Sequence, residues 1–352
     1  MKILHVISTL QTGGAEHLMV DLLPALRDLG NEVELLLING QKTPFYKELE
    51  SKGIIIHKLQ ENGRMYSPSH IFKVKKYLKL FDVIHTHTSP CQFLFSFAKM
   101  LYRSKTPMVT TEHSTTNHRR GKPFLKPFDR LMYKQYKMKI CISKKSLDNL
   151  AAHLGSYDGL IEINNGINFN KFTHTIKESL PVTKTIIMVA SMRDAKDQDT
   201  VIKAMTLLDD KYILKLVGDG PRKQQLQQLC EKINVANKVI FMGNRTDIPE
   251  LLRESDFVVL SSHWEGLSLA CIEGMASGRP FLASDVQGLG EIVREYGIVF
   301  PEGDYKSLSK EIIKLSEDSI HYKVVAEKCI ERAKEFDINI MANKYNNIYQ
   351  SL

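Results

Sequence analysis

The sequence predicts an α/β protein built from two doubly wound, parallel-sheet domains. Short apolar runs rich in β-branched residues alternate with stretches whose apolar residues recur every three or four positions. The runs are almost continuously apolar, as expected for strands that helices cover on both faces. The length of 352 residues also exceeds what one hydrophobic core usually supports, which favours two domains.

The strand-like runs fall into two series separated by a polar segment. The first series comprises residues 2–7, 33–38, 54–59, 82–87, 107–111, 139–143 and 160–164, and the second comprises residues 185–190, 212–218, 238–243, 257–262, 280–285 and 297–300. A helix is predicted over residues 15–30, where the apolar spacing ends on a glycine. The chain from about residue 307 onward is also predicted to be helical.

We therefore expect four parts along the chain. These are an N-terminal Rossmann-like domain (1–170), a hinge (171–184), a second Rossmann-like domain (185–335) and a C-terminal helix (336–352) that crosses back to the first domain. Ligands of doubly wound sheets bind at the carboxyl ends of the strands. The two domains are accordingly expected to face each other across a cleft.

Cysteine usage and hydropathy indicate the compartment. The five cysteines are widely spread (positions 91, 141, 230, 271 and 329), and none forms a C-x-x-C pair. This disfavours a disulfide framework or a zinc site and favours a reducing compartment. The first apolar run lacks the pattern of a signal peptide, and no apolar stretch approaches the ~18 residues of a membrane span. We expect a cytoplasmic protein, with peripheral association at the inner membrane face.

The net charge of +8 is unevenly distributed. Residues 99–145 contain thirteen Lys and Arg residues (99, 103, 105, 119, 120, 122, 126, 130, 134, 137, 139, 144 and 145) against Glu112 and Asp129. Such a segment suggests a surface for acidic lipids, a diphosphate-linked acceptor or nucleic acid, and the alternative is a solvated helix face. Nucleic acid is disfavoured because the aromatic residues form no recognisable readout module.

The stretch EGLSLACIE (265–273) places a glutamate at each end of seven small or apolar residues. In a continuous helix, Glu265 and Glu273 would lie about 80° apart around the axis and about 12 Å apart along it. Two carboxylates in that arrangement cannot share one reacting atom. The spacing predicts separate tasks, with one carboxylate on the turn entering a helix and the other inside the helix.

Two glycine pairs follow predicted strands, and neither is a dinucleotide fingerprint. Gly13 and Gly14 precede a helix and form either a tight turn or a loop that a phosphate or sugar approaches. The second pair, in GDGPRK (218–223), has Lys223 where the third glycine of the fingerprint belongs. A NAD-dependent dehydrogenase is therefore disfavoured.

Two further groups of polar residues lie just past strand ends. Arg193 and Lys196 occupy a position that suits a diphosphate, although surface charges at a helix start have the same pattern. Asp197 and Asp199 are better explained as helix caps than as metal ligands. The histidines at 85, 87 and 113 lack the signal of a fourth zinc ligand, and His113 is expected to face the cleft.

Taken in order, the motifs resemble those of glycosyltransferase family 4, which has the two-domain GT-B fold. The resemblance rests on GGAE (13–16), TEH (111–113), the restart with Arg193 and Lys196, VGDGP (217–221), the segment 254–280 with its E-x7-E, and YGIVFPEGD (296–304). It implies retaining transfer of a sugar from a nucleotide-sugar donor, with UDP as the default nucleotide, and neither a cofactor nor a bound metal.

The resemblance also implies roles for individual residues. The expected catalytic residues are Glu265, His113, Lys196 and Arg193; the expected donor-binding residues are Gly14, Asn244, Arg245, Gly266, Leu267, Ser268, Leu269 and Glu273. In many relatives the arginine stands five residues before the lysine, at the position that Ser191 occupies here. Whether Arg193 takes over its role is left open.

The implied function is transfer to an acceptor hydroxyl in cell-surface polysaccharide or glycolipid synthesis. The acceptor would be a glycan or a lipid-linked molecule, and residues 99–145 would face an anionic membrane. Two alternatives are a sugar-nucleotide epimerase or phosphorylase on a similar frame, and a nucleotide-sugar binding protein without catalytic activity.

Overall fold

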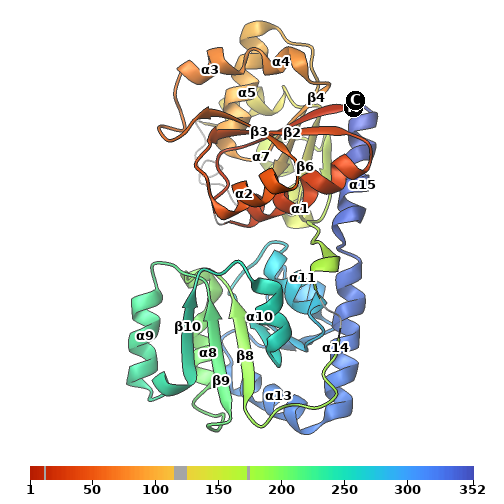
Figure 1. The fold of residues 1–352 in the computed structure, drawn as a ribbon. Helices are drawn as coiled ribbons and strands as arrows, with labels where there is room; N and C mark the ends of the chain where they lie inside the picture. The colour runs from red at the N-terminus through yellow and green to blue at the C-terminus, as the bar shows by residue number, and fades with distance from the viewer. Residues whose placement is uncertain (12, 115–124, 173–174) are drawn as a thin grey trace. The chain divides into compact units, whose positions relative to one another are not determined.

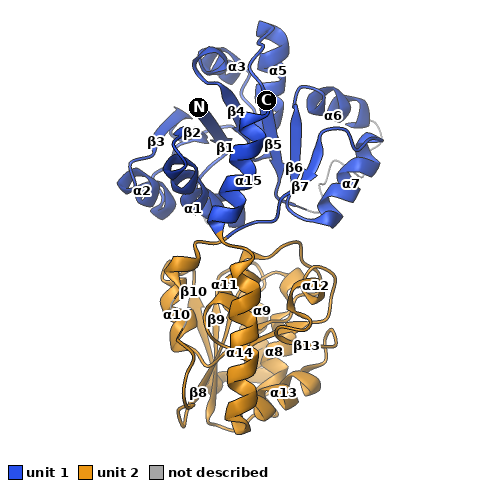
Figure 2. Cartoon of the chain, turned by 90° about the vertical axis from the view of Figure 1, so that its right-hand side faces the viewer, with its two compact units in different colours: residues 1–166, 338–352 blue, residues 167–337 orange. Residues whose placement is uncertain are grey.

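The computed structural model describes residues 1–11, 13–114, 125–172 and 175–352. The chain divides into two compact units (Figures 1 and 2). Unit 1 comprises Met1–Gly166 and Ile338–Leu352, and unit 2 comprises Ile167–Asp337. The chain thus leaves unit 1 at residue 166 and returns to it at residue 338.

Unit 1 contains a seven-stranded, fully parallel sheet in the order β3-β2-β1-β4-β5-β6-β7. Its strands are β1 (Lys2–Ile7), β2 (Glu32–Asn39), β3 (Ile55–Gln60), β4 (Val83–Thr86), β5 (Met108–Glu112), β6 (Met138–Cys141) and β7 (Leu160–Glu162). Its helices are α1 (Gly14–Asp28), α2 (Pro44–Ser51), α3 (Ser69–Val74), α4 (Tyr77–Leu80), α5 (Ser89–Tyr102), α6 (Lys126–Tyr133), α7 (Lys144–Leu154) and α15 (Ile338–Gln350). The strand order reverses between β1 and β4.

The two faces of the unit 1 sheet bury different chemistry because successive side chains of a strand point to opposite faces. Leu4 and Ile84 pack with Phe95 of α5 in an apolar core. The neighbouring His5 and His85 are register partners on β1 and β4, and both contact Tyr349 of α15. The face toward α15 therefore contains buried polar groups.

Unit 2 contains a six-stranded parallel sheet in the order β10-β9-β8-β11-β12-β13. Its strands are β8 (Lys184–Val189), β9 (Tyr212–Val217), β10 (Val239–Gly243), β11 (Phe257–Leu260), β12 (Phe281–Ser284) and β13 (Ile298–Phe300). Its α-helices are α8 (Gln198–Ala204), α9 (Lys223–Lys232), α10 (Ile248–Glu254), α11 (Leu269–Ala276), α12 (Gly290–Val293), α13 (Tyr305–Glu317) and α14 (Ser319–Lys334). The order reverses between β8 and β11.

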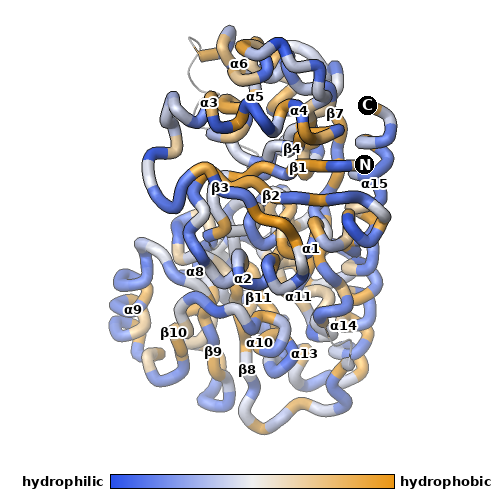
Figure 3. The backbone as a smooth tube through the Cα atoms, turned by 45° about the horizontal axis from the view of Figure 1, so that its top comes forward, coloured by the Kyte–Doolittle hydropathy of each residue, from blue (hydrophilic) through white to orange (hydrophobic). Residues whose placement is uncertain are grey.

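The predicted fold class is confirmed, since both sheets are parallel and doubly wound. Apolar residues concentrate along strands such as β1 and β2 (Figure 3). Several strands end one or two residues before the predicted limit, as β4 does at Thr86 and β11 at Leu260. The predicted hinge (171–184) follows the crossing at residue 166, and Phe172 is only 7% exposed in the core of unit 2. Residues 338–352 of the predicted C-terminal helix belong to unit 1.

Among the described helices, none has the length and apolar character needed to cross a bilayer.

Candidate functional site

The candidate site of unit 2 lies at the carboxyl edge of its sheet, where the strand order reverses. The loop after β8 carries Lys196, and the loop after β11 carries Glu265. Because β8 and β11 are adjacent strands that diverge into separate loops, this edge is the usual ligand position of a doubly wound sheet. Residues 69 positions apart in sequence thus meet at one point.

Lys196 and Glu265 form an ion pair at this point. The Lys196 side chain is 22% exposed and that of Glu265 is 9% exposed, so the pair is largely shielded from water. Ser262 donates a second hydrogen bond, of 2.8 Å, to the same Oε1 atom of Glu265. The carboxylate is therefore held in one orientation by two donors from different loops.

The backbone of the loop after β8 is fixed around Asp197. This residue adopts a left-handed conformation (φ 45°, ψ 51°) and caps α8 by accepting hydrogen bonds from the amide and hydroxyl of Thr200. Ser261 donates a 2.6 Å hydrogen bond to the carbonyl of Asp197. The prediction that this aspartate is a helix cap is confirmed, and burial raises its pKa.

Two contacts join the remaining loops to this edge. His263 bonds Glu302 of the loop after β13 through Nδ1 at 2.7 Å, and its amide donates to the carbonyl of Ala195. Gly288, in the loop after β12, has φ +94°, and a Cβ atom there would lie 2.4 Å from the carbonyl oxygen of Glu265. Only glycine fits this approach, because an L side chain would meet both strain and a clash.

Helix α11 begins just after Glu265 and extends away from the same edge. It starts at Leu269, so Gly266, Leu267 and Ser268 form the turn that enters it, and the Ser268 side chain does not cap it. The first amides of a helix have no partner within the helix and carry partial positive charge. The carboxylate of Glu265 therefore precedes a helix end that favours anions.

Glu273 lies about one turn inside α11 and is 5% exposed. The separate positions predicted for the two glutamates are thus confirmed, although Glu273 is less deep in the helix than a continuous nine-residue helix would place it. Gly274 beside it packs closely on the sheet, because a Cβ atom there would lie within 3 Å of Phe281 and Val258. Leu267, Cys271 and Ile272, from the apolar run between the glutamates, belong to the core of unit 2 and anchor the helix.

The two arginines near this edge differ in their contacts. The Arg193 side chain is exposed and has no ion pair among the described residues. Arg222, in the loop after β9, forms a bidentate pair with Asp199 at 2.6 and 3.1 Å and a further pair with Asp194. The sequence argument did not single out Arg222, Ser262 or His263; the only signal was their position at or shortly after the ends of predicted strands.

Asn244 and Arg245 follow β10, on the other side of β9 from Lys196. Both are exposed, and Arg245 forms an ion pair with Asp247. They belong to the same carboxyl edge of the sheet, two strands away from the point where the order reverses.

In unit 1, the predicted residues His113 and Gly14 also follow strand ends. His113 succeeds β5 and bonds His87 through its Nε2 atom at 3.0 Å. Burial lowers the pKa of His113 to about 4, so its ring is neutral at physiological pH. Gly14 is the first residue of α1, and a Cβ atom there would meet nothing within 4 Å. Packing therefore does not require glycine at that position.

His5, His85 and His87 are the described group that could hold a metal ion, with ligand atoms within 4.8 Å of one another. All three are buried. Their nitrogen atoms also bond one another and neighbouring hydroxyl groups, as analysed below.

In the predicted basic segment (99–145), several of the described cations have acceptors close by. Arg119, Arg120 and Lys122 lie outside the described residues. Three of the others donate hydrogen bonds to backbone carbonyls: Lys99 to Thr106, Arg130 to Leu154 and Lys139 to Asp158. Lys144 forms an ion pair with Asp148. These contacts support the alternative that much of the charge serves local structure.

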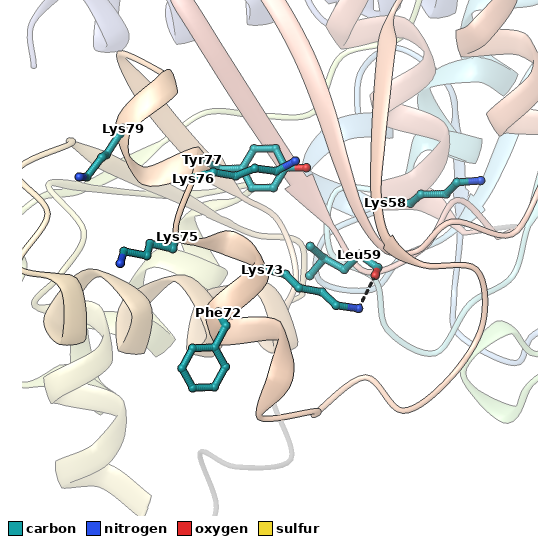
Figure 4. A pocket seen from close by; sticks show the side chains of 8 residues that line it. All are labelled: Lys58, Leu59, Phe72, Lys73, Lys75, Lys76, Tyr77 and Lys79. Carbon is teal, nitrogen blue, oxygen red and sulfur yellow. Dashed lines mark hydrogen bonds between the residues drawn. The ribbon is translucent and has the colours of Figure 1, made fainter.

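A second group of exposed lysines lies around α3 and α4. A pocket of 570 Å³ is lined there by Lys58, Leu59, Phe72, Lys73, Lys75, Lys76, Tyr77 and Lys79 (Figure 4). Lys73 bonds the carbonyl of Leu59, whereas Phe72 is 72% exposed and points away from that contact. We call these eight residues the α3–α4 basic surface.

Two family profiles match the chain and together span residues 12–336. "Glycosyltransferase Family 4" matches residues 12–171, and "Glycosyl transferases group 1" matches residues 171–336. The chain belongs to glycosyltransferase family 4. The resemblance noted from the motifs is thereby confirmed, and so is the prediction that the protein is an enzyme, a glycosyltransferase.

Relatives agree with that assignment. The glycosyltransferase is 26% identical over 285 residues to N-acetyl-alpha-D-glucosaminyl L-malate synthase of Bacillus anthracis, covering 76% of this chain and 74% of that protein. It is 25% identical over 346 residues, 94% of each chain, to N-acetylgalactosamine-N,N'-diacetylbacillosaminyl-diphospho-undecaprenol 4-alpha-N-acetylgalactosaminyltransferase of Campylobacter jejuni.

A solved structure confirms the fold. Anabaena HepE, crystallised with UDP and glucose, is similar over 100% of both chains with a TM-score of 0.86 and 21% identity. The glycosyltransferase therefore has the GT-B fold that the motifs implied.

Proposed function

We propose that this enzyme transfers a sugar from a nucleoside diphosphate sugar to an acceptor hydroxyl with retention of the anomeric configuration. Unit 2 binds the donor at the carboxyl edge between β8 and β11. The observation that supports this most is the shielded Lys196–Glu265 pair beside the start of α11. It provides an ammonium, a carboxylate and a positive helix end within one small region.

In this proposal Lys196 and the amides of residues 266–269 stabilise the leaving diphosphate. An ammonium and the first amides of a helix both favour a phosphate anion. When the diphosphate binds, the Lys196 ammonium turns toward it, and the Ser262 hydroxyl keeps hold of Glu265. Glu265 then faces the donor sugar and favours positive charge at its anomeric carbon.

The chemical step exchanges one bond at the anomeric carbon for another. The bond from that carbon to the phosphate oxygen breaks, and the oxygen takes the electron pair. The acceptor oxygen forms its bond on the same face of the sugar. Its proton passes to the departing phosphate oxygen, so no enzyme nucleophile is needed and the anomeric configuration is retained.

The other site residues have supporting roles. Glu273 binds the ribose hydroxyls from inside α11, and Asn244 and Arg245 contact the base at the edge after β10. Arg193, whose exposed side chain has no described ion pair, swings onto the diphosphate. In unit 1, Gly14 lets a phosphate approach the start of α1, and His113 contacts the reacting sugar.

The acceptor is proposed to be a glycan or a lipid-linked molecule. The Campylobacter jejuni relative carries a diphospho-undecaprenol acceptor in its name. The α3–α4 basic surface offers cations and an exposed aromatic ring to an anionic membrane surface. Together with residues 99–145, it would form the membrane-facing region, at the inner face of the cytoplasmic membrane.

A donor screen tests the proposed function. Purified enzyme is incubated with UDP-, GDP- and ADP-sugars, beginning with UDP because HepE was crystallised with it, and stabilisation by each ligand is followed by thermal unfolding. Extracted lipid-linked and soluble glycans then serve as acceptors, and NMR of the product determines the anomeric configuration. Inversion would refute the retaining mechanism. Epimerised free donor, dependence on inorganic phosphate, or binding without any turnover would refute transfer.

A further inference from the structure

A continuous line of hydrogen bonds runs from His113 through the buried interior of unit 1 to helix α15. His113 Nε2 lies 3.0 Å from His87 Nδ1, and His87 Nε2 lies 2.8 Å from His5 Nδ1. His5 Nε2 then lies 3.4 Å from the hydroxyl of Tyr349. Three histidine side chains near the reversal point of the sheet are thus connected to Tyr349 of α15, which lies 344 residues from His5 in sequence.

The line continues beyond Tyr349. Its hydroxyl lies 2.6 Å from His85 Nδ1, and His85 Nε2 lies 2.8 Å from Thr111 Oγ1. Thr111 Oγ1 lies 3.0 Å from the hydroxyl of Tyr345, where the line ends. Apart from His113, every member is at most 2% exposed.

Each histidine in the line is neutral at physiological pH. Burial lowers the pKa of His5 to about 3, and it lowers those of His85 and His87 well below the ordinary value. A neutral imidazole has one N–H donor and one acceptor nitrogen. Because both nitrogens of His5, His85 and His87 have partners, the tautomer of each ring fixes that of the next.

A hydroxyl in the line can accept from both neighbours, but its own O–H then has no acceptor along the line, so a fully bonded line has only two directions. The buried end of the line selects between them. Within the described part of the chain, the Tyr345 hydroxyl has Thr111 as its hydrogen-bond partner. If Tyr345 donates to Thr111, every donor along the line finds an acceptor. In the reverse direction, the Tyr345 O–H would remain buried without an acceptor, which is costly.

We propose that Tyr345 and Tyr349 are positioning residues that set the tautomer of His113 through this line. Tyr345 donates to Thr111, Thr111 to His85, His85 to Tyr349, Tyr349 to His5, His5 to His87 and His87 to His113. Nε2 of His113 therefore accepts, and Nδ1 carries the proton. His113 presents a fixed N–H donor to an oxygen atom of the sugar or its phosphate. The role of His113 toward the sugar or phosphate rests on the proposed function, whereas the prediction of its tautomer does not.

A metal ion at His5, His85 and His87 is the competing interpretation. The 2.8 Å separation of His5 Nδ1 from His87 Nε2 is a hydrogen-bond distance, with a proton between the two atoms. A metal ligated by both nitrogens would need them deprotonated and farther apart, at about 2 Å each from the ion. The observed geometry therefore favours the hydrogen-bonded line.

The tautomer is measured by ¹⁵N NMR of histidine-labelled, full-length enzyme, with His113→Gln used to assign the His113 resonances. We expect a protonated Nδ1 and an unprotonated Nε2 in the wild type. Tyr349→Phe keeps the ring but removes the hydroxyl between His5 and His85, and we expect it to give a mixture of both tautomers. Tyr345→Phe, which removes the terminal donor, is the second variant if the first does not fold.

Tyr136→Phe is the matched control. Tyr136 is also a fully buried tyrosine of unit 1, but its hydroxyl bonds the carbonyl of Gln92, outside the line. We expect this variant to lose stability and keep the wild-type tautomer. A wild-type His113 protonated at Nε2, or a tautomer unchanged in both line variants, would overturn the proposal. Zinc that co-purifies stoichiometrically and is lost in His5→Gln would do the same.

Kinetics separate this proposal from the proposed function. With a working donor and acceptor, Tyr349→Phe should lower kcat in proportion to the fraction of His113 in the unproductive tautomer, about twofold for an equal mixture, with donor KM unchanged. An unchanged kcat alongside a mixed tautomer would overturn the role of the line in catalysis. If no transfer is found with any acceptor, the proposed function fails, and the NMR result still decides the tautomer.

Discussion

The two units place different chemistry at equivalent positions of similar sheets. In unit 1, where the order reverses between β1 and β4, neutral imidazole and hydroxyl groups form a buried line. In unit 2, where it reverses between β8 and β11, an ammonium and a carboxylate form a shielded ion pair. The same topology thus presents neutral hydrogen-bond donors in one unit and full charges in the other.

Burial explains this difference. His5 and His85 are fully buried, where a charge would be costly, so their rings stay neutral. Each ring relays the donor-to-acceptor direction of the hydrogen bonds and carries no charge. The Lys196 side chain retains 22% exposure, and its charge is balanced by Glu265. A charged pair at the edge can exchange partners with a diphosphate, whereas a buried neutral line keeps one geometry.

Removing the charged pair of unit 2 should have the largest effect. We expect Lys196→Ala and Glu265→Ala each to lower kcat about 10²- to 10³-fold, since preorganised charge acts directly on the transition state. Steady-state kinetics with the donor found by screening measures this.

Lys323→Ala is the control for those variants. Lys323 also forms a lysine–glutamate pair in unit 2, with Glu178, but on the exposed surface of α14. It should retain wild-type turnover. Near wild-type rates for both site variants would remove Lys196 and Glu265 from the mechanism.

Acidification should weaken unit 1 more than unit 2. Burial lowers the folded-state pKa of His5 to about 3 and of His113 to about 4, below the ordinary value of 6.5. Between pH 6.5 and the lowered pKa of each histidine, the unfolded chain binds protons that the folded unit does not. Stability is therefore lost as pH falls below 6.5. Each such histidine lowers the free energy of unfolding by about 1.4 kcal/mol per pH unit in that range.

Hydrogen exchange between pH 7 and pH 5 measures this difference on one molecule. Peptides from β1, β4 and β5 should lose protection before peptides from β8 and β11. Equal loss in both units would show that the histidines of unit 1 are protonated without unfolding it.

The cap at Asp197 should have a smaller effect, confined to unit 2. Asp197→Ala removes the acceptor for Thr200 and places an alanine in the left-handed region, which should cost about 1–2 kcal/mol of unfolding free energy. Asp197→Asn keeps one acceptor oxygen for the Thr200 amide, and asparagine tolerates that backbone region. Thermal unfolding should rank the asparagine variant close to wild type, and the opposite ranking would show that the carboxylate charge matters more than the cap.

The α3–α4 basic surface should show the smallest effect per residue. Lys75→Ala, Lys76→Ala and Lys79→Ala should each weaken binding to vesicles containing anionic lipid by about 1 kcal/mol, because the attraction is electrostatic. Sedimentation at physiological salt measures this, with Lys323→Ala as the control and neutral vesicles as the blank. Undiminished binding by the triple variant would place the membrane contact elsewhere or leave a soluble acceptor.

Local patterns of the sequence determined much of this protein. Its strands, its two-sheet class, the cap at Asp197 and the separate positions of Glu265 and Glu273 follow from apolar runs, capping chemistry and spacing. These features depend on neighbours within a few residues, and side-chain periodicity records them directly.

Only the tertiary structure decided which distant groups meet. The register that pairs His5 with His85, the return of α15 with Tyr345 and Tyr349, and the contact of Lys196 with Glu265 join residues 69 to 344 positions apart. It also showed that Lys99 and Lys139 of the basic segment bond nearby carbonyls, which a count of charges does not reveal. Spacing along the chain determines the face of a helix or strand on which a side chain lies, but strand order and helix packing determine its partner. The partner in turn sets the protonation of the side chain and the direction of its hydrogen bonds.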